Sequence, residues 1–216
     1  MSGQAPVPEV KVTVFGVTDV GVVRTNNEDN FLLAELTTGT VGLVPEILAH
    51  EIREQGTLFV VSDGMGGAEA GEVASRIVVE GMRAELETIT HGHFSVEDAV
   101  RAAVERVNAT IWTEAQNNPK CKGMGATLAA AWIRGSEALI TGVGDSRVYL
   151  LRAGKMRQIT RDQSMVESLV EVGMIDRQAA EQHPQRNVIL QAMGARPEVV
   201  VAIERLELRR GDFLLL

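Results

Sequence analysis

The sequence has very little cysteine and fewer basic than acidic residues, and both features exclude classes of protein. Cys121 is the single cysteine among 216 residues. No intramolecular disulfide can therefore form, which fits a reducing cytosol. Acidic residues outnumber basic ones by 29 to 21, and the formal net charge is −8. This balance argues against a protein whose main task is to hold nucleic acid or an anionic membrane. Cys121 follows the turn-like stretch Asn-Asn-Pro-Lys, and we interpret it as incidental rather than as a nucleophile.

Long apolar runs are missing as well. No run approaches the roughly 20 residues that cross a membrane, and the N-terminus lacks the apolar stretch of a signal peptide. The sequence also contains no internal repeat and no low-complexity linker. We therefore expect one domain over residues 10–216, preceded by a loose lead-in over residues 1–9, in a cytoplasmic protein.

The stretch from Leu58 to Gly71 is the most informative part of the sequence. The apolar run Leu58–Val61 predicts a buried strand that stops at Asp63-Gly64, before two more glycines and a helical pattern. Asp63 thus lies at the end of a rigid strand, in a loop whose glycines let the backbone approach a ligand closely. Such an aspartate suits Mg²⁺ or Mn²⁺, which prefer oxygen ligands. The alternative is an ordinary tight turn, because Asp-Gly is a common turn pair.

Periodicity and turn residues predict the other elements. Alternating valines predict a strand from Val10 to about Asp19, and the connection over residues 37–56 is expected to be irregular, with a short helix around 45–53. One long helix should begin near Gly71. A second should begin after Ser95, which forms a capping box with Asp98. Further strands are expected over 31–36, 128–133, 138–144, 148–151, 199–206 and 213–216. The strands over 128–133, 138–144 and 148–151 should form an antiparallel meander. Two shorter helices are expected from Ser164 to Gly173 and after Asp176.

His91 and His93 lie between the two long helices. Two closely spaced histidines are compatible with a metal site, but no further cluster of ligand-type residues accompanies them. We interpret them as solvated loop residues.

Five short motifs occur in the order and at the spacing of one known enzyme family. They are Arg24-x-x-Asn27-Glu28-Asp29, Asp63-Gly64-Met65-Gly66-Gly67 with Gly71-Glu72, Gly125-x-Thr127, Gly144-Asp145-Ser146-Arg147 and Thr160-Arg161-Asp162. Together they resemble the metal-dependent protein phosphatases of the protein phosphatase 2C type, from about Val14 to the last residue. Met65 and the stretch His183-Pro-Gln-Arg-Asn187 are typical of the bacterial branch. Each motif is weak alone, but five in order make chance a poor explanation.

The resemblance implies a fold and a set of site residues. The expected fold is α+β, with two packed antiparallel sheets flanked by helices on both outer faces. Gly71, Glu72, Gly125 and Thr127 resemble packing and loop-geometry positions. For the metals, the resemblance implies two Mn²⁺ or Mg²⁺ ions bridged by Asp63, with the Gly64 carbonyl as a ligand to one of them. It implies that Glu28 and Asp29 support the second ion and its waters. Asp145 resembles a ligand to a third, more weakly bound ion.

The implied function is a serine/threonine protein phosphatase that hydrolyses phosphoserine and phosphothreonine with a metal-activated water. Arg24 resembles the arginine that grips the substrate phosphate, for which a permanently charged fork of donors is well suited. The expected partners are phosphorylated proteins, substrates of a Ser/Thr kinase, with no nucleic acid or membrane partner, and the expected state is a monomer. Two alternatives are a degenerate phosphoprotein-binding or regulatory module of the same fold, and an anti-anti-sigma-type regulatory phosphatase of a stress cascade.

Three departures from the family pattern stand out. Met65 occupies a position where many eukaryotic relatives have a histidine proposed as general acid. Gln163 stands where many bacterial relatives have histidine, and little effect is expected. The pattern also continues past Leu216 into two segments that each supply a metal-binding aspartate. We therefore expect a C-terminally incomplete chain, with strands missing beside residues 213–216 and with weak or no activity as it stands.

Overall fold

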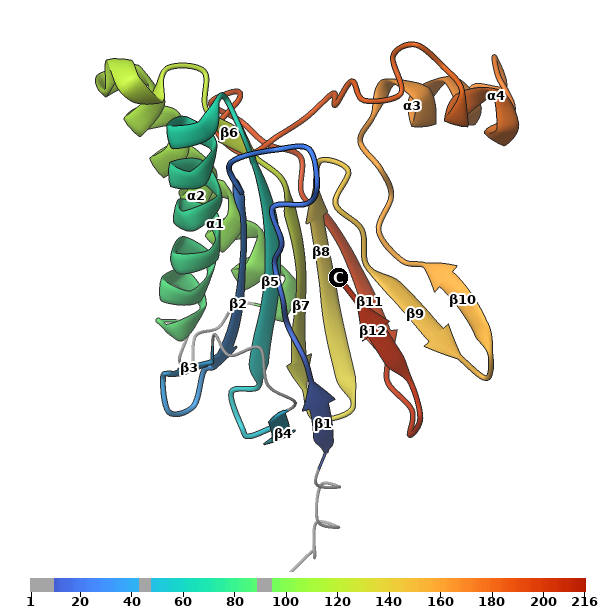
Figure 1. The fold of residues 1–216 in the computed structure, drawn as a ribbon. Helices are drawn as coiled ribbons and strands as arrows, with labels where there is room; N and C mark the ends of the chain where they lie inside the picture. The colour runs from blue at the N-terminus through green and yellow to red at the C-terminus, as the bar shows by residue number, and fades with distance from the viewer. Residues whose placement is uncertain (1–9, 43–47, 89–94) are drawn as a thin grey trace, which may run out of the picture.

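The structure is a computed structural model that describes residues 10–42, 48–88 and 95–216. Its largest unit is an antiparallel sheet with strand order β11–β8–β7–β5–β2–β3, and a short strand, β6, also pairs with β5 (Figure 1). Its strands are β2 (Asp29–Glu35), β3 (Thr40–Gly42), β5 (Thr57–Met65), β6 (Gly125–Ala126), β7 (Leu128–Arg134), β8 (Glu137–Val143) and β11 (Ala202–Glu207). The central strands β5 and β7 are almost continuously apolar because both of their faces are covered.

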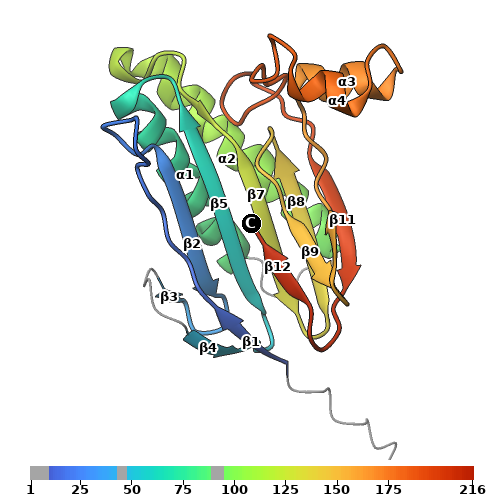
Figure 2. The same cartoon turned by 45° about the vertical axis from the view of Figure 1, so that its right-hand side comes forward.

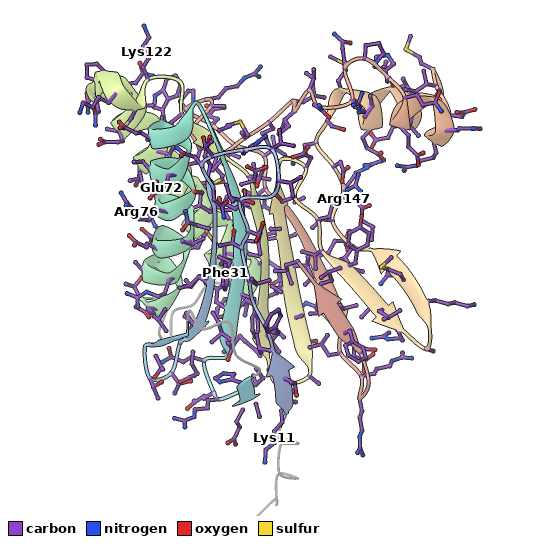
Figure 3. The ribbon with its side chains drawn as sticks, viewed as in Figure 1. Lys11, Phe31, Glu72, Arg76, Lys122 and Arg147 are labelled. Atoms are coloured by element: carbon purple, nitrogen blue, oxygen red, sulfur yellow. The ribbon has the colours of Figure 1, made fainter. Side chains whose placement is uncertain are left out.

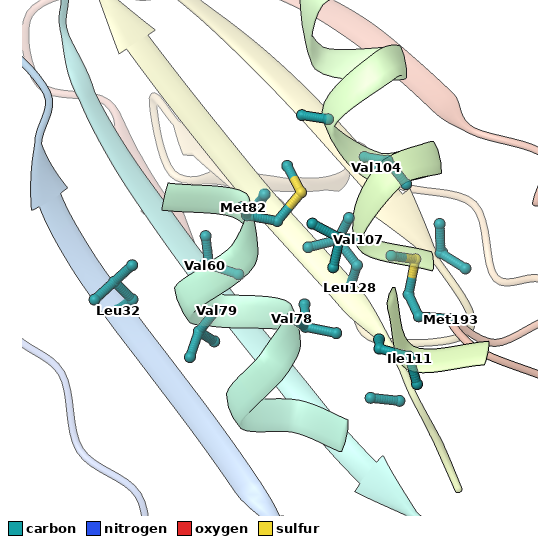
Figure 4. Packing of buried hydrophobic residues seen from close by; sticks show 14 of the residues in the cluster. Leu32, Val60, Val78, Val79, Met82, Val104, Val107, Ile111, Leu128 and Met193 are labelled. Atoms are coloured by element: carbon teal, nitrogen blue, oxygen red, sulfur yellow. The ribbon is translucent and has the colours of Figure 1, made fainter. Parts of the chain in front are cut away.

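Two long antiparallel helices cover one face of this sheet (Figure 1). They are α1 (Ala68–Glu87) and α2 (Val96–Asn117), which leads into a short 3-10 turn, η1 (Pro119–Cys121). Between helices and sheet, Met82 and Ile111 are fully buried and pack with residues of the strands such as Val60 and Leu128 (Figure 4). The predicted cap of α2 is confirmed, because the Ser95 hydroxyl accepts the Asp98 N–H at 3.1 Å.

Two smaller sheets lie on the opposite face (Figure 2). One has the order β10–β9–β12, and the other pairs β1 with β4. Their strands are β1 (Lys11–Val14), β4 (Leu48–Glu51), β9 (Tyr149–Arg152), β10 (Lys155–Gln158) and β12 (Phe213–Leu215). A second apolar cluster, which includes Ile133, Ile140 and Leu150, fills the space between the sheets. The predicted α+β arrangement of packed antiparallel sheets with helices is thus confirmed.

Two short helices, α3 (Met165–Glu171) and α4 (Arg177–Glu181), lie beyond the end of the smaller sheet (Figure 1). Ser164 caps α3, and Asp176 caps α4 as predicted, each accepting a backbone N–H three residues on. Gly173 follows α3 with a φ of +71°, the left-handed conformation that suits a helix end.

The structure corrects four expectations about individual elements. β1 ends at Val14 rather than near Asp19, because the chain turns there: a Cβ on Gly16 would lie 2.5 Å from the Phe31 ring, and Asp19 caps the following turn. Residues 48–51, expected in a helix, form β4 because they pair with β1. β5 continues past Asp63 to Met65, because β6 pairs with its last residues. The meander is also interrupted, since β8 and β9 belong to different sheets. His91 and His93 lie outside the described residues.

Candidate functional site

A cleft of about 720 Å³ opens where β2 starts, β5 ends and α1 begins. It collects four predicted site residues from two distant parts of the chain, namely Arg24, Glu28, Asp63 and Gly64. The other residues that line it are Val23, Thr25, Asn26, Met65, Gly66, Gly67, Asn187 and Ile189.

Asp29 and Asp63 form the centre of this site. They are directly opposite each other in the antiparallel pairing of β2 with β5, so their side chains project to the same side of the sheet. The walls of the cleft displace water from Asp63 even though the residue faces the opening. This desolvation, together with the charge of Asp29, a hydrogen bond to Asp29 and the charge of Asp145, raises the pKa of Asp63 to about 6, and Arg24 opposes the shift. Two carboxylates held together in this way favour a cation between them.

The backbone of Asp63 is held by a buried threonine. The Asp63 N–H donates to the Thr127 hydroxyl at 2.9 Å, and the Thr127 N–H donates to the Asp63 carbonyl at 2.9 Å. The same hydroxyl is 2.6 Å from the Ser146 hydroxyl, next to Asp145. Thr127 is fully buried, so this chain of hydroxyls is shielded from water and fixes Asp63 relative to the Asp145 loop.

Asp145 lies where the chain crosses from β8 to β9, that is, from the large sheet to the smaller one. Desolvation raises its pKa, and the charge of Asp162 adds to the shift. Arg147 binds both carboxylate oxygens of Asp162, with an Nε–Oδ1 distance of 2.9 Å. The charge of Asp145 also raises the pKa of Asp63, so the two carboxylates are close enough to repel each other. The ion pair of Arg147 with Asp162 helps to fix the loop that carries Asp145.

Gln163 is a site-supporting residue that sequence reasoning underrated. Its side-chain oxygen accepts the Gly144 N–H at 2.7 Å and the Gln191 side-chain N–H at 2.9 Å. Its backbone bonds the Gly144 carbonyl and the Leu190 N–H. Gln163 therefore ties the Asp145 loop to both ends of the α3–α4 segment. No local pattern could have shown this, because its partners lie 19 to 28 residues away.

Glu28 is positioned by the start of α1. The Gly64 N–H donates to the Glu28 carbonyl at 3.2 Å, and the Ser75 hydroxyl donates to the same carbonyl at 2.5 Å. Its carboxylate lies against the helix, since a Cβ on Gly71 would be only 1.9 Å from Glu28 Oε2. Gly71 is therefore a close-approach position, as expected. Glu72 was also expected to be a packing or loop-geometry position, but its side chain is exposed on the outer side of α1 (Figure 3).

The structure brings the predicted ligands near one another without completing a cluster. Within residues 10–42, 48–88 and 95–216, no group of three or more histidine, cysteine, aspartate or glutamate side chains is close enough to hold a metal ion. The donors that do meet are the carboxylates of Asp29 and Asp63, and their repulsion fits a divalent cation that prefers oxygen ligands. Cys121 is buried away from the lining of this cleft. None of the described helices is long and apolar enough to cross a membrane.

Comparisons with known proteins identify the family. Residues 47–202 match the family model described as Protein phosphatase 2C. The chain belongs to the protein phosphatase 2C family. A serine/threonine phosphatase of Listeria innocua, stp, is 34% identical over 203 residues, which cover 92% of this chain and 73% of that protein. The match confirms the resemblance drawn from the motifs and the predicted class of hydrolase.

Solved structures agree with this assignment to the protein phosphatase 2C family. The serine/threonine phosphatase Stp1 from Staphylococcus aureus superposes with a TM-score of 0.75 at 30% identity, covering 96% of this chain and 76% of that one. The catalytic domain of the serine/threonine phosphatase PstP, solved with two manganese ions, superposes with a TM-score of 0.69 at 30% identity, covering 96% of this chain and 75% of that one. At these identities the likeness extends beyond the fold.

The contact between Gly71 and Glu28 gives a first prediction. Gly71→Ala should weaken Mn²⁺ binding by about 10- to 100-fold, the usual effect of disturbing a residue that supports a metal ligand. The added methyl would displace the Glu28 carboxylate and would lie 3.0 Å from the Gly64 backbone carbon. Alanine is the better helix former by about 1 kcal/mol, so part of the lost packing is regained. Calorimetric titration with Mn²⁺ and thermal melting measure the two effects.

Gly81→Ala is the matched control for this prediction. It lies in the same helix, and its methyl would meet the Val107 side chain at 2.9 Å, away from the cleft. We expect it to change the melting temperature with little change in Mn²⁺ affinity. Equal Mn²⁺ affinities for Gly71→Ala and the unaltered protein would show that the position of Glu28 is unimportant for the metal.

Proposed function

We propose that this chain hydrolyses phosphoserine and phosphothreonine side chains of proteins in the cleft around Asp63. The observation that carries the proposal is Asp63, which lines the same cleft as Arg24 and is paired with Asp29, whose carboxylate helps to raise its pKa. The two carboxylates are suited to binding metal ions, and the permanently charged guanidinium beside them is suited to binding a phosphate dianion.

The proposed roles of the residues are those that the family resemblance implies. Asp63 would bridge the ions, with the Gly64 carbonyl as a further ligand. Asp29 and Glu28 would hold the second ion and its waters, and Asp145 would hold a third. When bound, Mn²⁺ or Mg²⁺ supplies Lewis acidity that makes water a nucleophile near neutral pH and offsets the charge of the phosphate. The solved PstP domain contains two manganese ions, which supports this choice of metal.

Arg24 would bind the phosphate. It lines the cleft, its side chain is exposed, and its charge reaches Asp63, where it lowers the carboxyl pKa. A guanidinium can donate two parallel hydrogen bonds to phosphate oxygens and so orient the phosphorus toward the attacking water. The thioether of Met65 carries no proton, so the leaving alkoxide must receive its proton from water or from another group.

The partners are proposed more broadly. We expect substrates that a Ser/Thr protein kinase has phosphorylated, because relatives in this family are named serine/threonine phosphatases. The net charge of −8 supports proteins rather than nucleic acid or anionic membrane as partners. We further propose a single domain over residues 10–216 that acts as a monomer in the cytoplasm. The reducing conditions of the cytoplasm suit a protein with one free cysteine.

The test of this function is turnover of p-nitrophenyl phosphate and of a phosphothreonine peptide in the presence of Mn²⁺. We expect release of phosphate from both. Arg24→Ala should raise KM by about 10-fold or more, with a smaller effect on kcat, because the lost contact is already made in the bound ground state. Its Mn²⁺ affinity should stay close to that of the unaltered protein. Tight binding of the phosphopeptide without turnover would instead support a non-catalytic binding module.

A further inference from the structure

Apolar side chains from two separate segments of the chain belong to the lining of the cleft. On one side is the turn before Arg24, where Val22 is 102% and Val23 is 89% exposed. On the other side is Ile189, in the segment that follows α4. Val23, Met65 and Ile189 all line the cleft. We call Val22, Val23, Met65 and Ile189 the apolar rim.

The rim has no evident structural purpose on its valine side. A fully exposed valine contributes no packing to the fold, and other side chains would serve a surface turn as well. The rim is nevertheless continuous with the site, because Val23 precedes Arg24 directly and Ile189 lies two residues from Asn187, which also lines the cleft. Exposed apolar surface beside polar groups is typical of a ligand-binding surface.

The position of Arg24 decides which part of a ligand meets the rim. A phosphoryl group bound by Arg24 and directed toward Asp63 places the phosphorylated residue inside the cleft. The residues on either side of it must then pass the lining residues Val23 and Ile189, with Val22 next to Val23 in the chain. Charged flanking side chains would lose hydration there without gaining a partner, whereas aliphatic ones would bury apolar area.

We propose that the apolar rim selects phosphopeptides with aliphatic residues next to the phosphoserine or phosphothreonine. This rests on the proposed function, because it assumes that the phosphate binds at Arg24. The rim acts on the flanking residues rather than on the phosphate, so Val23 and Ile189 determine specificity and are not catalytic residues. Acidic flanking residues are the least favoured, because a carboxylate would lose hydration against the apolar rim without gaining a partner.

The experiment compares two phosphothreonine peptides that differ only in their flanking residues, valine and leucine in one, serine and glutamate in the other. The unaltered protein should prefer the aliphatic peptide by about 10-fold or more in kcat/KM, mainly through KM, as expected for a small apolar contact. Val23→Ser and Ile189→Ser should each reduce that ratio several-fold. The ratio of the two peptides is the readout, so a general loss of activity in a variant does not affect it.

Val172→Ser is the matched control. Val172 is also strongly exposed, at 68%, but lies at the end of α3 outside the cleft lining. This variant should keep the full preference. Equal kcat/KM values for the two peptides with the unaltered protein, or a preference that survives in both Val23→Ser and Ile189→Ser, would overturn the proposal.

Two further measurements separate this proposal from the proposed function. Fluorescence anisotropy of the labelled peptides reports binding without turnover, so the preference can be measured even if no phosphate is released. Absence of p-nitrophenyl phosphate hydrolysis with Mn²⁺ would count against the proposed function alone. Self-association that Val23→Ser abolishes, with no effect on peptide preference, would identify the rim as a contact between copies of the chain and would overturn the proposal.

Discussion

Asp63→Asn is expected to lower kcat by about 10³-fold or more while leaving the fold intact. Asparagine has nearly the same shape, and its backbone keeps the hydrogen bonds to Thr127. The substitution removes the negative charge that would bridge the two cations. Its loss should lower kcat at least as much as the loss of one hydrogen-bond donor from an oxyanion hole. Turnover of the phosphothreonine peptide at saturating Mn²⁺ measures the loss.

The same substitution should not destabilise the metal-free protein. The raised pKa of Asp63 means that its carboxylate is less stable in the fold than in the unfolded chain, chiefly through desolvation and the charge of Asp29. Removing the charge relieves this penalty, so the melting temperature at neutral pH should stay equal or rise. Loss of activity together with loss of stability would assign Asp63 a structural role instead.

Asp176→Asn is the control for this prediction. Asp176 caps α4 by accepting the Ala179 N–H at 2.7 Å, and asparagine caps a helix about as well. It makes the same change of charge outside the cleft, so kcat should not change. A fall in kcat comparable to that of Asp63→Asn would mean that net charge, and not the bridging ligand, controls turnover.

Local sequence features predicted the parts of the site that depend on neighbouring residues. The strand before Asp63, the caps at Ser95 and Asp176, and the helix end at Gly173 are each determined by chemistry within a few residues. The family motifs predicted that Arg24, Glu28 and Asp63 belong to one site, and these three residues line one cleft. The predicted caps and helix end agree with the structure because their physical causes lie close together in the chain.

The remaining features depend on contacts between distant segments. The pairing of Asp29 with Asp63 follows from the register of β2 and β5, which no single stretch determines. The hydroxyl chain from Thr127 to Ser146 spans 19 residues, and the contact between Glu28 and Gly71 depends on how α1 packs at the end of β5. Residues 48–51 form a strand because β1 offers a partner, which overrides their local preference.

Metal removal should have the second large effect, and it should depend on pH in a defined direction. After chelation, turnover of the phosphothreonine peptide is expected to fall to the background level and to return when Mn²⁺ is added. The metal must displace the proton from Asp63, whose pKa in the metal-free protein is about 6. The apparent Mn²⁺ affinity should therefore change little above that pH and fall by about 10-fold per pH unit below it.

In the metal-free protein, the contribution of Asp63 to stability should show the opposite trend. The pKa of Asp63 is higher in the fold, about 6, than its ordinary value of 3.8. At Asp63 the folded protein thus binds more protons than the unfolded chain between these values, so the contribution of Asp63 to stability should rise as the pH falls through about 6 toward about 4. Asp145, whose pKa is also raised by burial and by Asp162, adds to the same trend. Because Glu35 and Asp212 have lowered pKa values and contribute the opposite trend, the Asp63 contribution is read as the difference from Asp63→Asn.

Thermal melting with and without millimolar Mn²⁺, at several pH values from about 5 to 8, tests both expectations. The stabilisation by Mn²⁺ depends on its concentration relative to Kd, so it should be largest above about pH 6 and shrink below it. Asp63→Asn should abolish most of this pH dependence, because the competing proton site is gone. A stabilisation by Mn²⁺ that is the same at pH 5 and pH 8, or turnover that survives chelation, would show that the cation does not bind at the Asp29–Asp63 pair.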